Sequence, residues 1–228
     1  MRKSLETLTI ALWVCATLAT VTVLAAYMRY RQETQAAAND QRTQPTFPID
    51  HDLPGDLPAA PVDITQRLFP VPAFELHDEN NVEVTQEKLL GKPWVAAFIF
   101  TNCQGSCPAM SGHMATLQKK IDNKDVKLVS FTLDPERDTP EVLKAYAKKF
   151  DADPSRWYFL RGNYEQMQSI AKDMKIATAD PLPGSDQILH SSKFLLVDKT
   201  NTIRGIYDGN SAATLDTIAK DAEILARE

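Results

Sequence analysis

Cysteine is scarce in this chain, and so is surplus positive charge. Three cysteines in 228 residues are too few to build a disulfide scaffold. Lysine and arginine number 25 against 30 aspartates and glutamates, which leaves a net charge of −5. No basic field is available to neutralise phosphates, so we expect no binding of nucleic acid. The composition, with 43% hydrophobic and 24% charged residues, is that of a globular protein and excludes collagen-like and wholly disordered chains.

Charge is absent from a run of 22 residues near the N-terminus, from Thr7 to Met28. A helix of this length spans roughly 30 Å of hydrocarbon, at about 1.5 Å per residue. The alternative is a cleaved signal peptide, for which Val23-Leu24-Ala25 offers a small-residue site. Signal h-regions are usually shorter, at about 7–15 residues. We therefore predict a membrane anchor over residues 1–28, formed by one transmembrane helix in which Cys15 is apolar filler.

Residues 29–66 are predicted to form a flexible tether. Half of the fourteen prolines fall between Pro45 and Pro72, together with Gln, Asn, Asp and Ala, and such a stretch buries too little apolar surface to order itself. Basic residues flank both ends of the anchor, so charge alone hardly decides its orientation. A short head and a long soluble tail favour export of the tail. We expect a single-pass membrane protein with its soluble domain on the extracytoplasmic (periplasmic) side.

Residues 67–228 have the pattern of one α/β domain. Strands are expected near residues 74–76, 82–84, 94–100, 127–132, 157–160, 193–197 and 202–207. Helices are expected from about Pro108, Pro140, Asn163 and Ala212. Strands that alternate with helices and end in a hairpin and a helix predict a central mixed sheet flanked by helices.

Cys103 and Cys107 lie between the apolar strand of residues 94–100 and the helix that begins near Pro108. Sites in open α/β sheets lie at the carboxyl ends of strands, and a helix N-terminus favours the thiolate, which is both nucleophile and metal ligand. A structural disulfide across so short a loop would contribute only about 2 kcal/mol. The polar loop between the cysteines is also a poor place for buried core thiols. The spacing therefore predicts a redox site or a metal site and leaves both open.

Two thiolates do not complete a metal site, so a third ligand is needed. The predicted domain has three histidines, His77, His113 and His190. His77 ends a predicted strand remote from the cysteines, and His113 lies on a different helical face from Cys107. His190 follows the turn-rich residues 180–186 on a loop just before a strand, where it can come beside the cysteines. Met110 and Met114 share a face with Cys107, and we interpret them as core.

Three motifs in this order resemble the SCO1/SenC family of thioredoxin-like copper proteins. They are Cys-Gln-Gly-Ser-Cys-Pro at 103–108, Leu-Asp-Pro-Glu-Arg-Asp-Thr-Pro at 133–140, and His-Ser-Ser at 190–192 ahead of Phe-Leu-Leu-Val-Asp at 194–198. The resemblance covers about residues 68–228 and implies a thioredoxin-like fold. It also implies that Cys103, Cys107 and His190 bind copper, as Cu(I) and/or Cu(II), and that the two cysteines form a disulfide when oxidised.

The resemblance implies a membrane-tethered copper metallochaperone that helps to load the copper site of a cytochrome c oxidase. Its partner would be the copper-containing oxidase subunit or another copper carrier. The alternative is a thiol–disulfide reductase in which Cys103 and Cys107 are catalytic, so whether the protein is an enzyme stays open. A membrane-tethered copper or redox sensor is a third hypothesis. Asp134 and Asp138 are expected beside the site, where they orient ligands or meet a partner, or else form a turn network with Arg137.

Overall fold

The computed structural model describes residues 28–29, 63–179 and 188–228. The predicted transmembrane helix, apart from Met28, and residues 30–62 of the predicted tether lie outside these ranges. Within the ranges, no helix combines the length and the apolar character that a membrane crossing requires. Contacts divide the chain between Pro48 and Ile49, and the fold below is that of the second part.

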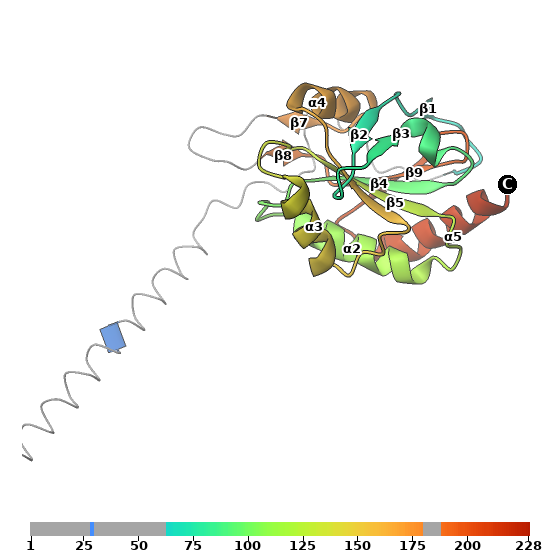
Figure 1. Ribbon diagram of the computed structural model, residues 1–228. Coiled ribbons are helices and arrows are strands. Elements are labelled where there is room, and N and C mark those ends of the chain that lie inside the picture. Colours follow the sequence, from blue (N-terminus) through green and yellow to red (C-terminus); the bar gives the residue numbers. More distant parts are fainter. Residues whose placement is uncertain (1–27, 30–62, 180–187) are drawn as a thin grey trace, which may run out of the picture. The chain divides into compact units, whose positions relative to one another are not determined.

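A six-stranded mixed sheet forms the centre of the domain, in the order β1-β10-β9-β4-β5-β6 (Figure 1). Its strands are β1 (Phe69–Pro70), β4 (Trp94–Ile99), β5 (Lys127–Thr132), β6 (Trp157–Leu160), β9 (Lys193–Val197) and β10 (Thr202–Asp208). Strands β4, β5 and β6 run parallel, whereas β9 is antiparallel to β4 and β10. Two hairpins lie outside this sheet: β2 (Glu75–His77) with β3 (Glu83–Thr85), and β7 (Thr178–Ala179) with β8 (Leu189–His190).

Helices cover both faces of the sheet. On one face lie α2 (Cys107–Lys120), α3 (Pro140–Lys149) and α5 (Leu215–Arg227), and the short 3₁₀ turn η2 (Ala212–Thr214) leads into α5. On the other lie α4 (Tyr164–Asp173), the β2–β3 hairpin and the 3₁₀ turn η1 (Gln86–Leu89). This is the α/β fold with a mixed sheet flanked by helices that the sequence predicts.

Strand β4 explains why its sequence is a continuous apolar run. It lies between β5 and β9, and all six of its residues are buried. Alternate side chains point to opposite faces of a strand. Val95, Ala97 and Ile99 therefore join the core beneath α2, α3 and α5, whereas Trp94, Ala96 and Phe98 join the core beneath α4. This packing fixes the carboxyl end of β4, from which the chain continues into the loop that carries the two cysteines.

Side-chain caps fix where α3 and α4 begin. Thr139 precedes α3 and accepts a hydrogen bond from the backbone N–H of Val142. Asn163 precedes α4 and forms a capping box with Gln166, in which each side chain bonds the backbone of the other residue. Such caps satisfy N–H groups that the first helical turn leaves without partners, and each contributes about 1 kcal/mol.

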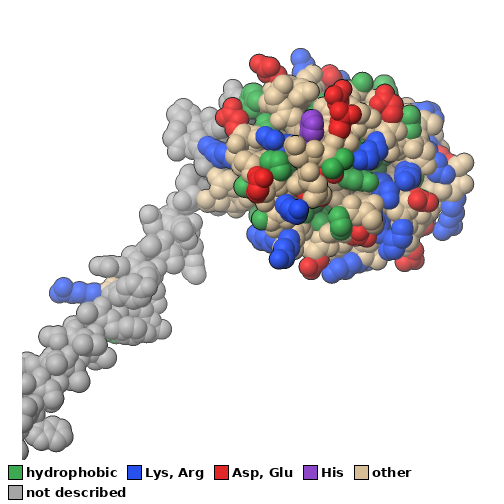
Figure 2. All heavy atoms as spheres, in the orientation of Figure 1, with side chains coloured by type: hydrophobic (Ala, Val, Ile, Leu, Met, Phe, Trp, Pro, Cys, Tyr) green, Lys and Arg blue, Asp and Glu red, His purple; other side chains and the backbone are tan. Residues whose placement is uncertain are grey.

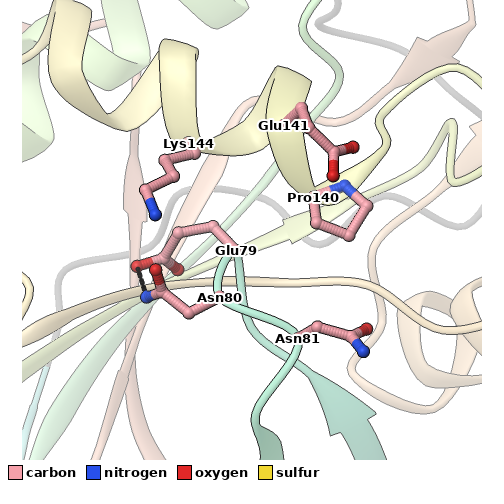
Figure 3. A pocket seen from close by; sticks show the side chains of 6 residues that line it. All are labelled: Glu79, Asn80, Asn81, Pro140, Glu141 and Lys144. Atoms are coloured by element: carbon pink, nitrogen blue, oxygen red, sulfur yellow. Dashed lines mark hydrogen bonds between the residues drawn. The ribbon is translucent and has the colours of Figure 1, made fainter.

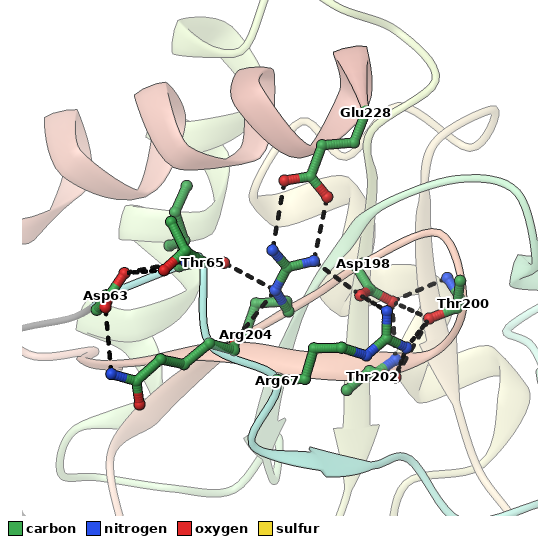
Figure 4. A network of polar contacts seen from close by, with 10 residues as sticks. Asp63, Thr65, Arg67, Asp198, Thr200, Thr202, Arg204 and Glu228 are labelled. Atoms are coloured by element: carbon green, nitrogen blue, oxygen red, sulfur yellow. Dashed lines mark hydrogen bonds and ion pairs between the residues drawn. The ribbon is translucent and has the colours of Figure 1, made fainter.

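The two ends of β4 carry different structures. At its carboxyl end Ala97 pairs with Phe194 of β9, so the Cys103–Cys107 loop lies beside the entrance to β9. At its amino end Trp94 pairs with Val197, next to the β9–β10 turn. There a polar network of Arg67, Asp198, Thr200, Thr202, Arg204 and Glu228 joins the turn to residues 63–67 and to the last residue of the chain (Figure 4).

On the face that Figure 2 shows, acidic and basic side chains are interspersed and hydrophobic side chains form small patches. The large hydrophobic residues exposed in the domain are spread over separate elements, among them Val82, Leu90 and Ile224. Isolated apolar residues of this kind are normal on a soluble surface.

Candidate metal centre

Cys103 and Cys107 are free thiols in different environments. Cys103 lies in the turn after β4 and is partly exposed, whereas Cys107 is the first residue of α2 and is fully buried. The backbone N–H of Gly105 donates to Cys103 Sγ at 3.3 Å, which bends the loop back over the first cysteine. The pair therefore combines one accessible sulfur with one enclosed sulfur.

His190 lies beside Cys107, as the sequence predicts. Its Nε2 is 3.3 Å from Cys107 Sγ, and its Nδ1 is 3.1 Å from the carbonyl oxygen of Ser191. A carbonyl oxygen can only accept, so Nδ1 carries the proton and a neutral ring offers Nε2 as an acceptor to the Cys107 thiol. Phe100 packs edge-on against the buried imidazole, with the ring centroids 6.0 Å apart.

The support of His190 differs from the loop expected from the sequence. His190 belongs to the two-residue strand β8 and pairs with Thr178 of β7, and the backbone N–H of Ser191 donates to Ala177 O. Thr178 in turn donates to the side chain of Gln168 on α4. These bonds tie the histidine segment to α4, a connection between distant segments that no local sequence pattern indicates.

The two thiols have opposite pKa shifts. A hydrogen bond from the Cys107 side chain lowers the pKa of Cys103 to about 7, helped by the backbone N–H groups of Cys107 and Gly105 and opposed by burial. Burial raises the pKa of Cys107, and its bond to Cys103 adds to the increase. The first proton therefore leaves Cys103. Because the Cys107 thiol has one proton, the Cys103 sulfur and His190 Nε2 compete for it.

Cys103, Cys107 and His190 are neighbours, but they do not all converge on one point. Over the parts of the chain that the structure describes, no group of three or more His, Cys, Asp or Glu side chains is arranged to hold a metal ion. The chemistry of the donors is nevertheless that of a soft-metal site, with two sulfurs and one imidazole nitrogen. Cys103 is held to the end of β4, because its backbone N–H donates to Phe100 O at 3.2 Å.

Asp138 braces the start of the cysteine loop. Its carboxylate accepts from the backbone N–H and the hydroxyl of Thr101, two residues before Cys103, and from the hydroxyl of Thr132 at the end of β5. The side chain is fully buried, and burial raises its pKa against these hydrogen bonds. Asp134 instead forms an ion pair with Arg137 at 3.0 Å, which is the turn network expected from the sequence as the alternative. Thr139, rather than either aspartate, caps α3.

The other candidates from the sequence lie apart from this arrangement. His77 is exposed on β2, and Met110 and Met114 are fully buried in the core beneath α2, as expected. His113 faces the end of β10, where its Nδ1 is 2.7 Å from Gly209 O. His51 lies outside the described residues.

Sequence reasoning missed Tyr146. This α3 residue hydrogen-bonds Ser111, one helical turn beyond Cys107, at 2.9 Å between the hydroxyl oxygens. Burial raises the pKa of Tyr146, the bond to Ser111 opposes that shift, and the nearby charges of Cys107 and Cys103 add to it. Asp138, in the turn before α3, thus holds the start of the cysteine loop at Thr101, and Tyr146 of α3 holds the helix that follows the loop at Ser111. A tyrosine at an ordinary helical core spacing carries no sequence signal for such a role.

A surface pocket of about 420 Å³ lies elsewhere, between the β2–β3 turn and the first turns of α3 (Figure 3). Its lining residues are Glu79, Asn80, Asn81, Pro140, Glu141 and Lys144. Glu79 is buried there and accepts from the backbone N–H of Phe159 on β6 and from the Asn80 amide. None of the predicted site residues lines this pocket.

Comparison with known proteins places these residues in a family. Residues 63–226 match the family model SCO1/SenC. The SCO1 protein homolog of Bacillus subtilis is 36% identical over 159 residues, which cover 68% of this chain and 82% of that protein. A SCO1/SenC family lipoprotein from Bacillus anthracis has a crystal structure similar to this one, with 36% identity, a TM-score of 0.65, and coverage of 69% of this chain and 95% of the other.

Two further solved structures, both of Sco proteins, are similar to this one. BsSco, described as a member of the Sco family of cytochrome c oxidase assembly proteins with a disulfide switch, is 34% identical with a TM-score of 0.64, over 71% of this chain and 96% of its own. Arabidopsis thaliana ScoI, solved with copper bound, is 26% identical with a TM-score of 0.60, over 69% of this chain and 99% of its own. The resemblance read from three sequence motifs is confirmed: this chain belongs to the SCO1/SenC family.

Proposed function

We propose that this protein is a membrane-tethered copper chaperone that binds copper through Cys103, Cys107 and His190 and helps to load the copper site of a cytochrome c oxidase. The observation that carries the proposal is the contact between Cys107 Sγ and His190 Nε2, 83 residues apart in sequence, beside the accessible Cys103. The copper-bound ScoI relative and the oxidase-assembly description of BsSco support it.

The donor set suits both oxidation states of copper. Two thiolates and an imidazole favour Cu(I) in a trigonal site, and a further donor would complete a tetragonal Cu(II) site. Binding requires that both sulfurs are reduced and deprotonated, so copper loading and disulfide formation exclude each other. The low pKa of Cys103 favours the thiolate near neutral pH, whereas the metal must displace the proton that Cys107 holds.

The unequal exposure of the two cysteines suggests an order of copper transfer. Cys103 is the accessible sulfur, so a ligand from the partner can replace it first, while Cys107 and His190 stay enclosed. For the three donors to meet at one copper ion, the loop of residues 101–106 would have to bring Cys103 Sγ to the ion that Cys107 and His190 hold. Asp138 would hold the start of that loop through Thr101 without being a ligand.

Copper titration of wild type and His190→Ala tests the ligand set. The reduced full-length protein in detergent should take up one copper tightly in competition with a chromophoric chelator. His190→Ala should bind at least a hundredfold more weakly, because it removes the nitrogen donor. His77→Ala is the matched control, since His77 is exposed on β2, and it should bind as wild type does. Full copper affinity in His190→Ala would disprove the three-ligand site.

Thiol–disulfide exchange is the second candidate function. The adjacent free thiols and the lowered pKa of Cys103 favour it, because the thiolate attacks disulfides. In this role Cys103 and Cys107 would be oxidised to a disulfide while a disulfide of an oxidase subunit or copper carrier is reduced to two thiols. Exchange at the wild-type rate in His190→Ala, together with lost copper binding, would show that the two activities are separable.

The membrane arrangement belongs to the same proposal. An anchor over residues 1–28 and a tether over residues 29–66 would hold the domain of residues 67–228 on the extracytoplasmic side. The last tether residues lie against the domain, because Arg204 donates to the backbone oxygens of Ile64 and Gln66. Protease digestion of sealed membrane vesicles of known orientation tests this, and cleavage of the domain from the cytoplasmic side would refute it.

A further inference from the structure

We propose that His113 is a positioning residue that holds the helix of Cys107 in register with the strand segment of His190. His113 was a candidate ligand from the sequence, but the fold turns it toward the end of β10. The inference rests on the proposed copper site, because its purpose is to keep two of the three proposed ligands together.

The connection runs through one glycine. His113 Nδ1 is 2.7 Å from the carbonyl oxygen of Gly209, and since that oxygen only accepts, His113 donates. The backbone N–H of Gly209 in turn donates to Ser192 O at 2.8 Å, two residues after His190. A chain of two short hydrogen bonds therefore joins α2 to the segment that carries the histidine.

The three segments are also packed closely at this point. A Cβ atom at Gly209 would lie 2.9 Å from Met110 Cε and 3.0 Å from Ser192 O. Met110 is fully buried on α2, one helical turn from Cys107. Gly209 is therefore packed between Met110 of α2 and the backbone of Ser192. The hydrogen bond from His113 to Gly209 can thus fix the position of α2 along its axis relative to the His190 segment.

The site has little tolerance for a shift of α2. Cys107 has a short side chain, and its sulfur meets His190 Nε2 at 3.3 Å from the very first turn of the helix. A displacement of about 1 Å is enough to disrupt a precisely oriented set of reacting or ligating groups. Ser111 and Tyr146 hold the neighbouring face of the helix against α3, so His113 supplies the contact toward β10.

Three variants test the role. His113→Ala removes the donor, and His113→Asn restores an N–H group at nearly the position of Nδ1. Gln118→Ala is the matched control, because Gln118 bonds Asp151 O and Asp153 N near the other end of α2, away from the site. Two quantities are measured on the reduced protein: copper affinity by competition, and the NMR ring signals of His190 before any copper is added.

We expect His113→Ala to weaken copper binding about tenfold and to shift the His190 ring signals, because partners that orient metal ligands typically affect affinity about 10–100-fold. His113→Asn should restore both quantities to within about twofold of wild type, and Gln118→Ala should change neither by more than that.

Wild-type affinity and unshifted ring signals in His113→Ala would overturn the inference. So would equal losses in His113→Ala and His113→Asn, since the imidazole itself would then be required, as in a ligand. If wild type binds no copper, the proposed function fails, and the His190 ring signals alone decide whether His113 positions the segment.

Discussion

At the level of single residues, the site depends on how differently the fold treats two identical side chains. Cys103 and Cys107 are four positions apart, yet one is partly exposed and the other fully buried at the start of α2. The bond from the Cys107 thiol stabilises the Cys103 thiolate, and burial works against a second negative charge on Cys107. The pair therefore behaves as one accessible thiolate supported by one protonated thiol.

This asymmetry predicts the pH dependence of alkylation. The rate at which iodoacetamide modifies Cys103 should rise with pH around a midpoint of about 7, because the folded pKa is lowered from the ordinary value of 9.0. Cys107 should stay unmodified over the same range. In Cys107→Ala the donor is lost, and the midpoint should move back up toward 9.0. Mass spectrometry of the modified peptides measures both sites, and a midpoint unaffected by the substitution would contradict the proposed bond.

At the level of elements, the candidate site is a meeting of parts that are separated in sequence. Helix α2 brings Cys107, β8 brings His190, and the turn before α3 holds the loop between β4 and α2 through Asp138. Each part is held by contacts of its own. The capping box fixes the start of α4, and Gln168 of α4 accepts a hydrogen bond from Thr178 of β7, the strand that pairs with β8. Precision at the sulfur and nitrogen atoms thus comes from packing between elements.

Two glycines near the site should respond oppositely to alanine. Gly209→Ala should lower the free energy of unfolding by about 1–3 kcal/mol, because the added Cβ would press on Met110 and Ser192. Gly112→Ala, within α2, should raise it by about 0.5–1 kcal/mol, because nothing lies within 4 Å of the added Cβ and alanine is the better helix former. Urea denaturation measures both: an unchanged or raised free energy of unfolding in Gly209→Ala would show that the packing at Gly209 is not tight, and a lowered one in Gly112→Ala would contradict the open space at that position.

At the level of the whole domain, the candidate site and residues 63–67 lie at opposite ends of strand β4. The cysteine loop follows the carboxyl end of β4, and residues 63–67 join the network at its amino end (Figure 4). Six residues of strand at about 3.3 Å each separate the two ends by roughly 20 Å.

Arg204 is the centre of the polar network that joins residues 63–67 to the β9–β10 turn. It is buried and pairs with buried Asp198 at 3.0 Å and with half-exposed Glu228 at 3.1 Å. Arg204→Ala should cost about 3–5 kcal/mol of unfolding free energy, because it leaves Asp198 charged and enclosed. Glu228→Gln should cost less than about 1 kcal/mol, because its partly exposed side chain is screened by water. Thermal or urea unfolding checks both, and equal losses would place the stabilisation elsewhere.

The same network predicts how stability responds to acid. Burial raises the pKa of Asp198, but hydrogen bonds from Thr200, Thr202 and Arg204 outweigh it, so the folded pKa lies below the ordinary 3.8. A carboxylate with a lowered folded pKa contributes stability at neutral pH and loses that contribution as the pH falls through 3.8 and below. Asp198→Asn should therefore flatten the pH dependence of unfolding in that range.

Much of the fold follows from local patterns. The apolar run at residues 94–99, the capping residues Thr139 and Asn163, and the alternating strands are readable because hydrophobic periodicity and helix capping act over a few residues. The short strands β1, β7 and β8 were not predicted. Each of these strands is two residues long, which is too short to show a hydrophobic period. They form because another segment of the chain pairs with them.

For the candidate site, the sequence by itself determined which atoms are present: two sulfurs on a strand-to-helix turn, an imidazole ahead of a strand, and the motifs of the SCO1/SenC family. Only the tertiary structure decided that His190 meets the buried Cys107, that Asp138 holds Thr101, and that His113 faces Gly209. Residue identity and spacing are local properties of the chain. Distances between segments 37 to 96 residues apart depend on how the sheet and helices pack, and no single segment encodes that packing.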